Sequence, residues 1–339
     1  MPSRPRPPDP GGFVSTGELP PPTIVRELVD EAHENYAAVR RGANAELYPA
    51  LARVPSELFG ICVVGLDGAE IAAGDAGYEF AIMSVSKPFV FALICETMGA
   101  DAAREELGVD ATGLPFNSLA AIEQGREGRT NPMVNPGAIA ASTLAPGTSV
   151  EERWSFLHDG LSRFAGRPLT IDREIYRSAS ATNTRNRSIA QLLEGYGRLA
   201  CSAAEAVELY TRQCSLVVSA RDLAVMGATL AGGGINPLTG ERVVDARTCH
   251  PTLAVMLTAG LYENSGEWLY SVGLPAKSGL GGGIVTVSPG KGGMGTFSPP
   301  LDAAGNSVRG QLVARHLSGQ LGMDLLLSEP ARPGASLSS

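Results

Sequence analysis

The stretch SVSK at 84–87, followed directly by the apolar run PFVFALIC at 88–95, decides the fold of this chain. It places a serine and a lysine three residues apart at the start of a buried helix, which we expect to end near Gly99. At that spacing both side chains lie on one helix face, so the amine can reach the hydroxyl. A serine hydroxyl is a weak nucleophile until a base takes its proton, and a desolvated lysine can be that base. The pattern therefore predicts Ser84 as a nucleophile and Lys87 as its base.

A second motif, KSG at 277–279, lies near the other end of the chain. The motif S-x-x-K alone is a weak signal, because a chain of this length can contain it by chance. Its combination with K-[ST]-G is typical of serine β-lactamases and penicillin-binding proteins. We therefore expect Lys277 to lie on a strand and to line the site, although a surface position is the alternative. Ser86 faces away from Ser84 on the helix and is expected to be a packing residue.

The composition describes a globular protein and narrows its partners. The 339 residues, 44% of them hydrophobic and 18% charged, fit one large domain or two closely joined ones. With 35 acidic and 27 basic residues the formal charge is -8, so neither nucleic acid nor an anionic membrane is an expected partner. The apolar runs are well short of the roughly 18 residues that a membrane span needs. Because residues 1–22 also lack a signal-peptide core, we expect a cytoplasmic enzyme.

Neither the cysteines nor the histidines have the spacing of a metal site. The five cysteines form no C-x-x-C pair, and we expect them to be structural thiols. The four histidines show no ligand spacing, so we expect no zinc. The sequence predicts neither a metal nor a cofactor.

The order of strand and helix signals predicts an α+β fold. Residues 1–22 and 329–339 are expected to be disordered tails, and 23–328 to form the catalytic domain. Strand patterns near both ends of that domain flank a mostly helical segment at about 101–255. We therefore expect an antiparallel sheet built from both termini and flanked by helices, with an inserted all-helical subdomain and the site at their junction. The clearest expected elements are helices at 23–39, 149–164, 187–196, 203–213, 220–230 and 308–321, and strands at 58–65, 70–81 and within 267–297.

Beyond the two motifs, the chain resembles the serine-dependent glutaminases, which hydrolyse L-glutamine to glutamate and ammonia. The similarity covers roughly residues 24 to 325, nearly all of the expected ordered chain. It is carried by long segments, among them NPMVNPGAI at 131–139, RNR at 185–187, QCS at 213–215, NPLTGERV at 236–243, GLY at 260–262 and VGLPAKSG at 272–279. Such a run of ordered matches is far more specific than either short motif.

The resemblance implies a serine β-lactamase-like fold, L-glutamine as the substrate and a homodimer or homotetramer. It implies Ser84 as the nucleophile, Lys87 as the holder of its proton and Tyr262 as a proton relay. The backbone amides of Ser84 and Leu280 would form the oxyanion hole. The implied substrate-binding residues are Ser84, Asn135, Asn186, Tyr210, Tyr262 and Leu280.

Three of these residues also have an ordinary structural interpretation. Asn135 precedes Pro136 and could cap a turn. Asn186 could N-cap a helix that starts at Arg187. Tyr210 could be a core aromatic. The surrounding matches favour the binding role for each of them.

Two positions depart from the resemblance. The family has a glutamate seven residues before the asparagine matched by Asn186, and it grips the α-ammonium of glutamine; this chain has Ala179 there. The family also reads Tyr-Ile-Pro where this chain has Leu47-Tyr48-Pro49, so Tyr48 is displaced by one position and is not counted as a site residue. Both departures concern the amino-acid end of the substrate rather than the amide chemistry.

Three functions therefore stay open from the sequence. The first is a glutaminase, EC 3.5.1.2, that acts through a serine acyl-enzyme. The second is an amidase of the same mechanism that acts on another small carboxamide, and Ala179 favours it. The third is a catalytically degenerate binding subunit, which the intact Ser84, Lys87 and Tyr262 disfavour.

Overall fold

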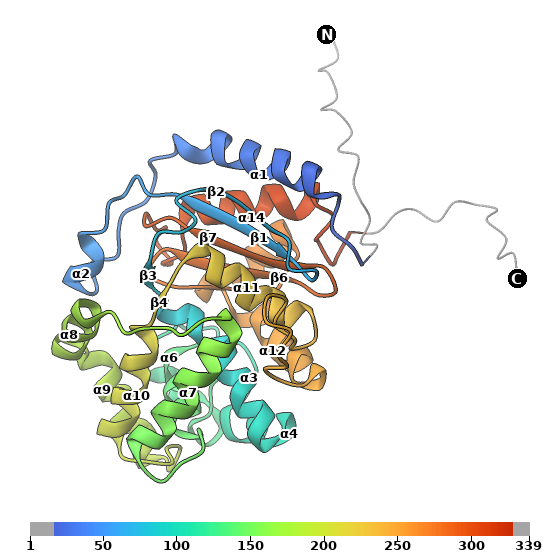
Figure 1. The fold of residues 1–339 in the computed structure, drawn as a ribbon. Coiled ribbons are helices and arrows are strands. Elements are labelled where there is room, and N and C mark those ends of the chain that lie inside the picture. Colours follow the sequence, from blue (N-terminus) through green and yellow to red (C-terminus); the bar gives the residue numbers. More distant parts are fainter. Residues whose placement is uncertain (1–16, 328–339) are drawn as a thin grey trace, which may run out of the picture.

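A five-stranded antiparallel sheet combines strands from both ends of the chain, as expected from the sequence (Figure 1). The computed structural model describes residues 17–327, so the expected tail at 329–339 and most of that at 1–22 lie outside the described residues. The strand order is β2-β1-β7-β6-β5, and the central β7 pairs with β1 from the N-terminal part. The strands are β1 (Gly60–Gly65), β2 (Glu70–Gly74), β5 (Ala276–Ser278), β6 (Gly283–Ser288) and β7 (Gly292–Phe297).

Helices cover both faces of this sheet. On one face lie α1 (Pro22–Ala37) and α14 (Val308–Gln320), whose apolar side chains share a core cluster with β1 and β6. On the other face α11 (Ala220–Ala231) crosses β7. The contact is close because β7 carries glycines there: a Cβ at Gly295 would lie 2.0 Å from the Ala220 carbonyl oxygen. The lack of side chains on β7 therefore sets the distance between helix and sheet.

A bundle of helices lies beside the sheet, and the apolar run of the opening motif forms its central helix. This helix, α3 (Lys87–Met98), is buried on every side from Lys87 to Cys95, which explains why its sequence has no polar face. The surrounding helices are α4 (Ala100–Leu107), α5 (Ala120–Gln124), α6 (Asn135–Thr143), α7 (Val150–Ala165), α8 (Arg173–Thr182), α9 (Thr184–Gly195), α10 (Ala203–Cys214) and α12 (Ala246–Ala259), with the short α2 (Pro49–Ala52) against α8.

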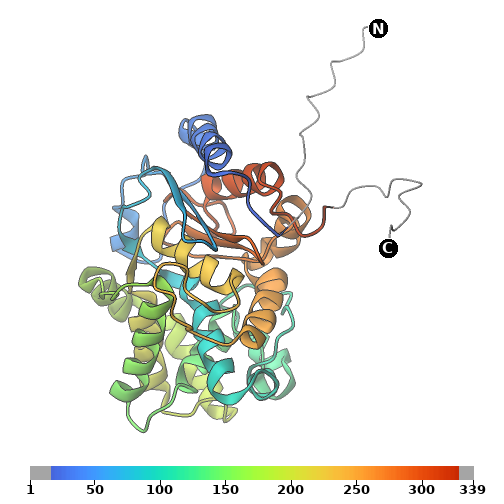
Figure 2. The same ribbon diagram turned by 45° about the vertical axis from the view of Figure 1, so that its right-hand side comes forward.

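Figure 2 shows from a second direction that the sheet layer stacks on the helical part. The expected helical subdomain, 101–255, includes α11, yet α11 packs on β1, β6 and β7. We therefore propose to place the end of the helical subdomain before α11. Between the two parts, β3 (Phe80–Ala81) and β4 (Val217–Val218) form a small separate sheet.

Two expected strands differ from the structure. The expected strand at 70–81 is interrupted after Gly74, because Asp75 starts a turn: its carbonyl accepts from the Tyr78 amide, and its carboxylate accepts from the Phe59 amide. The first part of the expected 267–297 strand region is instead the helix α13 (Ser265–Val272). Its buried residues Trp268 and Val272 are four apart, which is a helical period that the short apolar run concealed.

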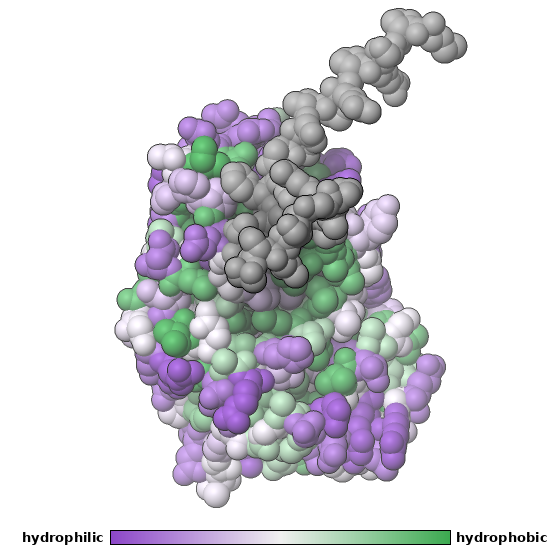
Figure 3. All heavy atoms as spheres, turned by 90° about the vertical axis from the view of Figure 1, so that its right-hand side faces the viewer, coloured by the Kyte–Doolittle hydropathy of each residue, from purple (hydrophilic) through white to green (hydrophobic). Residues whose placement is uncertain are grey.

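The face shown in Figure 3 is hydrophilic toward its upper and lower ends and carries hydrophobic residues between them. Within residues 17–327 every helix is too short or too polar to span a membrane. The same range holds no group of three or more His, Cys, Asp or Glu side chains that could bind a metal ion. All five cysteines are free, and four of them are buried.

Candidate active site

Ser84 lies in a short 3₁₀ turn, η1 (Met83–Ser86), that leads directly into α3. The turn is tight: Met83 has a left-handed backbone with φ of 49°, which costs a non-glycine residue about 1–2 kcal/mol. Ser86 fixes the turn from behind, since its hydroxyl donates to the Met83 carbonyl at 2.8 Å and accepts from Gln213 at 2.9 Å. Ser86 is therefore a packing residue, and Ser84 is held at a defined point between helix and sheet.

Lys87 is buried at the first position of α3 with few partners for its amine. The Nζ atom donates to Asn135 Oδ1 at 2.7 Å and to the Met133 carbonyl at 3.3 Å. Because burial disfavours the charged form, the pKa of Lys87 falls to about 7. Among the hydrogen bonds of residues 17–327, none joins Lys87 to Ser84. Near neutral pH the amine can therefore be uncharged, as a general base requires.

A directed chain of side-chain hydrogen bonds starts at the acceptor of this lysine. Asn135 Nδ2 donates to Asn186 Oδ1 at 2.9 Å, and Asn186 Nδ2 donates to Asn183 Oδ1 at 2.6 Å. Asn183 Nδ2 then donates to Thr211 Oγ1 at 2.9 Å, and Thr211 donates to the Val207 carbonyl at 2.7 Å. All four side chains are buried. Each acceptor fixes the orientation of the preceding amide, so the chain turns the Asn135 carbonyl oxygen toward the lysine.

Two phenols from opposite parts of the fold lie beside Ser84. Tyr210 comes from α10, and its hydroxyl also donates to Asn135 Oδ1 at 3.1 Å. Tyr262 comes from the 3₁₀ turn η3 (Tyr262–Asn264), and its hydroxyl lies 3.3 Å from the Ser278 carbonyl. Burial raises the pKa of both phenols, while the neighbouring Ser84 hydroxyl lowers it by less. Both are therefore neutral near pH 7, and each can donate a proton.

The sheet contributes β5 and the turn that follows it. Lys277 on β5 donates to the carbonyls of Gly260 and Ser278 at 2.8 and 2.9 Å, and its Nζ lies 4.2 Å from the centre of the Tyr262 ring. Burial, and then the charge of Lys87, lowers the Lys277 pKa well below its usual range. Lys277 thus lies on a strand directly beneath Tyr262, as the K-[ST]-G motif predicts.

The turn after β5 runs next to the nucleophile. A Cβ at Gly279 would lie only 3.2 Å from the Ser84 amide nitrogen, so this position favours a residue without a side chain. Leu280 follows in the same turn. Within residues 17–327, neither the Ser84 amide nor the Leu280 amide donates to a backbone carbonyl. Two backbone N–H groups near the nucleophile thus have no backbone acceptor.

The structure therefore brings most of the expected residues together in one network. Hydrogen bonds join Lys87, Asn135 and Tyr210. Ser84 lies beside Tyr210 and Tyr262. The network also reaches Asn186, through Asn135. Leu280 lies in the turn after β5, and its side chain packs against the apolar cluster that contains Tyr210. The catalytic and binding roles of these residues remain predictions.

Sequence reasoning missed two members of the network. Asn183 precedes α9, so its sequence position indicates only an N-cap, yet its side chain bonds Thr211 and Asn186 and makes no cap. Thr211 resembles any helical threonine bonded to the carbonyl four residues earlier. Asn186 lies inside the first turn of α9, which starts at Thr184 rather than at Arg187, so it is not the N-cap.

Tyr48 and Ala179 lie in the same apolar cluster as Met83 and Tyr210. Burial raises the pKa of Tyr48, and the neighbouring Cys214 thiol adds to this effect. Tyr48 also raises the pKa of Tyr210, so the displaced tyrosine still lies near the site. Ala179 is 3% exposed on the inner side of α8. The Ala179 methyl group is therefore part of the buried apolar cluster that contains Tyr210.

Comparison with known proteins identifies the family of the chain. The family model for glutaminase matches residues 42–326. The chain is 64% identical over 318 residues to Glutaminase 2 of Yersinia pestis and covers 94% of each chain. It is 47% identical to the glutaminase of Mycobacterium ulcerans, with 89% of this chain and 94% of that one covered.

Solved structures give the same result at the level of the fold. A structure described as probable glutaminase ybaS superposes with a TM-score of 0.89 at 43% identity, over 91% of this chain and all of that one. A probable glutaminase from Bacillus subtilis, solved in complex with 6-diazo-5-oxo-L-norleucine, gives 0.79 at 30% identity, over 90% and 96% of the two chains. With its S-x-x-K turn set against a K-S-G strand in a β-lactamase-like fold, the chain belongs to the serine-dependent glutaminase family.

Proposed function

We propose that this protein hydrolyses the side-chain amide of L-glutamine to L-glutamate and ammonia through an acyl-enzyme on Ser84. One observation carries the proposal: Ser84 lies beside two buried phenols and three residues before a buried lysine whose pKa is about 7. This arrangement supplies a nucleophile, a base and a proton donor in one enclosed site. Membership of the glutaminase family supplies the substrate class.

In the first half-reaction, Ser84 Oγ attacks the amide carbon of the substrate. A C–O bond forms, the hydroxyl proton passes to the neutral Lys87 amine, and the carbonyl oxygen becomes an oxyanion. The backbone amides of Ser84 and Leu280 would donate to that oxyanion, each contributing about 3–4 kcal/mol. The C–N bond then breaks, and Tyr262 delivers a proton to the departing nitrogen, which leaves as ammonia.

In the second half-reaction, water attacks the ester on Ser84. Its proton passes to the Tyr262 phenolate. Collapse of the second oxyanion breaks the ester C–O bond and releases the carboxylic acid, and Lys87 returns its proton to Ser84 Oγ. Because burial raises the pKa of Tyr262, the phenol is neutral near pH 7 and carries the proton that the departing nitrogen needs.

The side chains of Asn135, Asn186 and Tyr210 would hold the amino-acid end of the substrate. Asn183 and Thr211 act through them as positioning residues, since they fix the orientation of both amides. If the Asn135 amide were turned around, its NH₂ group would face the Lys87 amine. A protonated lysine is itself a donor and could not accept that hydrogen bond. The asparagine chain therefore fixes which polar groups the substrate meets.

A second candidate function is an amidase for a carboxamide whose amino group is absent or blocked. Ala179 favours it, because a buried methyl group occupies the position where the family resemblance implies a carboxylate. An ammonium without that carboxylate loses a charge-assisted hydrogen bond of about 1.5–3 kcal/mol. That is roughly 10- to 100-fold in affinity.

The deciding experiment is ammonia release from purified protein with L-glutamine, N-acetyl-L-glutamine and glutaramate, beside the Ser84→Ala and Ala179→Glu variants. We expect saturable hydrolysis of L-glutamine, a loss of more than about 1,000-fold in Ser84→Ala, and a lower KM for glutamine in Ala179→Glu. Hydrolysis of only the two analogues would select the second function. No ammonia release from any of the three substrates, or retained turnover in Ser84→Ala, would refute the acyl-enzyme proposal.

Three further features complete the proposal. The family resemblance supports a homodimer or homotetramer. The five free thiols support a reducing compartment such as the cytoplasm. The catalytic unit would span residues 23–328, because the sheet needs strands from both of its ends. Sedimentation velocity of the full chain tests the assembly state. A monomer at micromolar concentration would contradict the proposed homodimer or homotetramer.

A further inference from the structure

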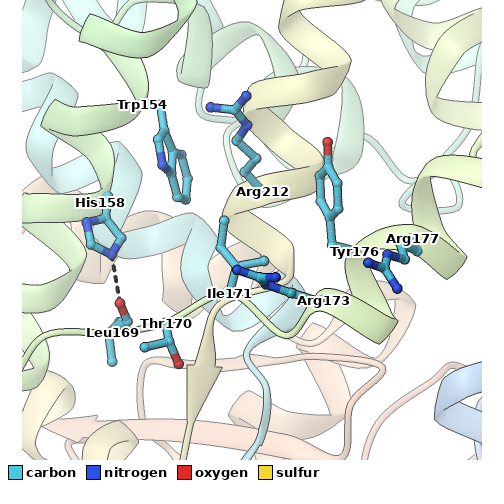
Figure 4. Close-up of a pocket in the computed structure, with 9 residues that line it drawn as sticks. All are labelled: Trp154, His158, Leu169, Thr170, Ile171, Arg173, Tyr176, Arg177 and Arg212. Carbon is cyan, nitrogen blue, oxygen red and sulfur yellow. Dashed lines mark hydrogen bonds between the residues drawn. The ribbon is translucent and has the colours of Figure 1, made fainter.

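A cavity of about 810 Å³ opens between α7, α8 and α10, and none of its lining residues belongs to the network around Ser84. Figure 4 shows side chains from all three helices, and from the segment that joins α7 to α8, arranged around this open space. The volume is ample for a small organic molecule. The lining residues are Trp154, His158, Leu169, Thr170, Ile171, Arg173, Tyr176, Arg177 and Arg212.

The charge of this lining is opposite to that of the chain. Three of the nine lining residues are arginines and none is acidic, whereas the whole chain carries a formal charge of -8. Arg173 and Arg177 lie one turn apart on α8, where two like charges repel. Within residues 17–327 the side chain of neither arginine makes an ion pair or a hydrogen bond. Two guanidinium groups on the cavity wall are thus available to an anion.

The third arginine is held rigidly and gives the cavity a fixed wall. Arg212 makes a bidentate ion pair with Glu151, with hydrogen bonds of 2.8 and 2.9 Å, and donates a further hydrogen bond to Glu208 at 2.7 Å. Its charge is therefore compensated outside the cavity. Its guanidinium lies 5.9 Å from the Trp154 ring centre and helps to hold the indole.

The remaining walls are aromatic and are also fixed by hydrogen bonds. The rings of Trp154 and His158 lie 5.5 Å apart, and His158 Nε2 bonds the Leu169 carbonyl at 2.7 Å (Figure 4). The Tyr176 hydroxyl donates to Glu208 at 2.6 Å. Because these side chains are held before any ligand arrives, binding would cost little ordering of the wall.

We propose that this cavity binds a small organic anion in which a phosphate or a carboxylate is joined to a planar ring. The guanidinium groups of Arg173 and Arg177 take the anionic group, since a guanidinium fork matches two oxygens of either acid. The ring packs against Trp154 and the apolar side chain of Ile171. The site goes beyond the proposed glutamine chemistry and does not depend on it.

Tryptophan fluorescence provides a direct test, because the chain has only two tryptophans. Trp268 is buried, and its indole N–H donates to the Leu274 carbonyl, so a Trp268→Phe variant leaves Trp154 as the reporter. The variant is titrated with AMP as the phosphate probe and phenylacetate as the carboxylate probe. Adenosine and inorganic phosphate, which carry the ring or the charge alone, are the matched controls. Calorimetric titration of the unmodified chain repeats the measurement without a substitution.

We expect saturable binding of AMP or phenylacetate, and the tighter of the two identifies the acid. Each of Arg173→Ala and Arg177→Ala should weaken it about tenfold, the loss of one charge-assisted contact. The matched control Arg26→Ala removes the same charge from the exposed face of α1 and should change nothing. No saturation up to about 10 mM, or equal affinity in Arg177→Ala and Arg26→Ala, would overturn the site. Binding of inorganic phosphate as tight as that of AMP would overturn the role of the ring.

Discussion

The wall of the site that comes from the sheet and the wall that comes from the helices hold their polar groups in different ways. The sheet wall, residues 277–280, offers backbone groups: the Ser278 carbonyl toward Tyr262 and the amide of Leu280. The helical wall consists of side chains that bond one another in sequence. Its members are Asn135, Asn183, Asn186, Tyr210 and Thr211.

This difference predicts where the protein tolerates substitution. A backbone donor survives most changes of its own side chain, so the sheet wall depends on the spacing of strands and turns. In the helical wall the loss of one hydroxyl leaves the next amide without its acceptor, and a buried polar group without a partner costs about 1–3 kcal/mol. Conservative side-chain changes should therefore have little effect on activity in the sheet wall and a larger effect in the helical wall.

The largest effect is expected at Lys87, whose amine bonds Asn135 of the helical wall. Lys87→Met should lower kcat/KM about 1,000-fold, because the base is lost while the volume is kept. In the unmodified enzyme the neutral amine predominates above its pKa of about 7. We therefore expect kcat/KM to rise tenfold per pH unit below about pH 7 and to level off above it. A profile of ammonia release that stays flat from about pH 5.5 to 8 would exclude Lys87 as the base.

The next effect concerns the spacing on which the sheet wall depends. Gly295→Ala should lower the free energy of unfolding by about 3 kcal/mol, because its Cβ would meet the Ala220 carbonyl oxygen at 2.0 Å and push α11 from β7. Gly319→Ala in α14 is the matched control: its Cβ would meet nothing within 4 Å, and alanine favours a helix by about 1 kcal/mol. Urea unfolding measures both, and equal stability of the two variants would contradict the close contact.

A smaller effect is expected from Thr211→Val in the helical wall. The change keeps the shape but removes the acceptor of Asn183, so kcat/KM should fall about tenfold. The midpoint of the pH profile should move to lower pH, because a loosened Asn135 carbonyl stabilises the lysine ammonium less. Thr229→Val removes the same kind of buried helical hydroxyl from α11 and serves as the control. If both variants lose stability alone and keep the wild-type profile, Thr211 has no positioning role.

The smallest effect is expected from Leu280→Val in the sheet wall. Because the proposed contribution of this residue is its amide, kcat and KM should each change by less than about twofold. Steady-state kinetics on the two purified enzymes is sufficient for the comparison. A tenfold loss of kcat would show that the leucine side chain, rather than the turn, positions the oxyanion donor.

The sequence predicted the parts of the fold that local pattern controls. The strand at β1, the helix α3 with its buried lysine, and the final helix α14 follow from apolar runs and periodicity. The strand expected at 70–81 is instead two strands, β2 and β3, because the carboxylate of Asp75 bonds the Phe59 amide and a turn starts there. Such a contact depends on the tertiary fold and leaves no mark in the local pattern.

The candidate site shows the same division. Ser84 and Lys87 were predictable because their spacing on one helix carries the chemistry. Asn183 and Thr211 were not, since each looks like an ordinary helix-end or mid-helix residue until α9 and α10 are packed together. Tyr48 was set aside on its shifted position, yet the structure buries it beside Cys214 and near Tyr210.

The chain of asparagine amides also makes the state of the lysine visible by spectroscopy. The side-chain NH₂ groups of Asn135, Asn186 and Asn183 are buried, and each is bonded in a fixed direction. Their ¹⁵N–¹H resonances should be well dispersed and should exchange slowly with solvent. When the lysine loses its proton, the change in polarisation passes along the chain. The ionisation of Lys87, the proposed base, can then be followed in the resting protein at Asn183, a residue with no proposed part in bond breaking.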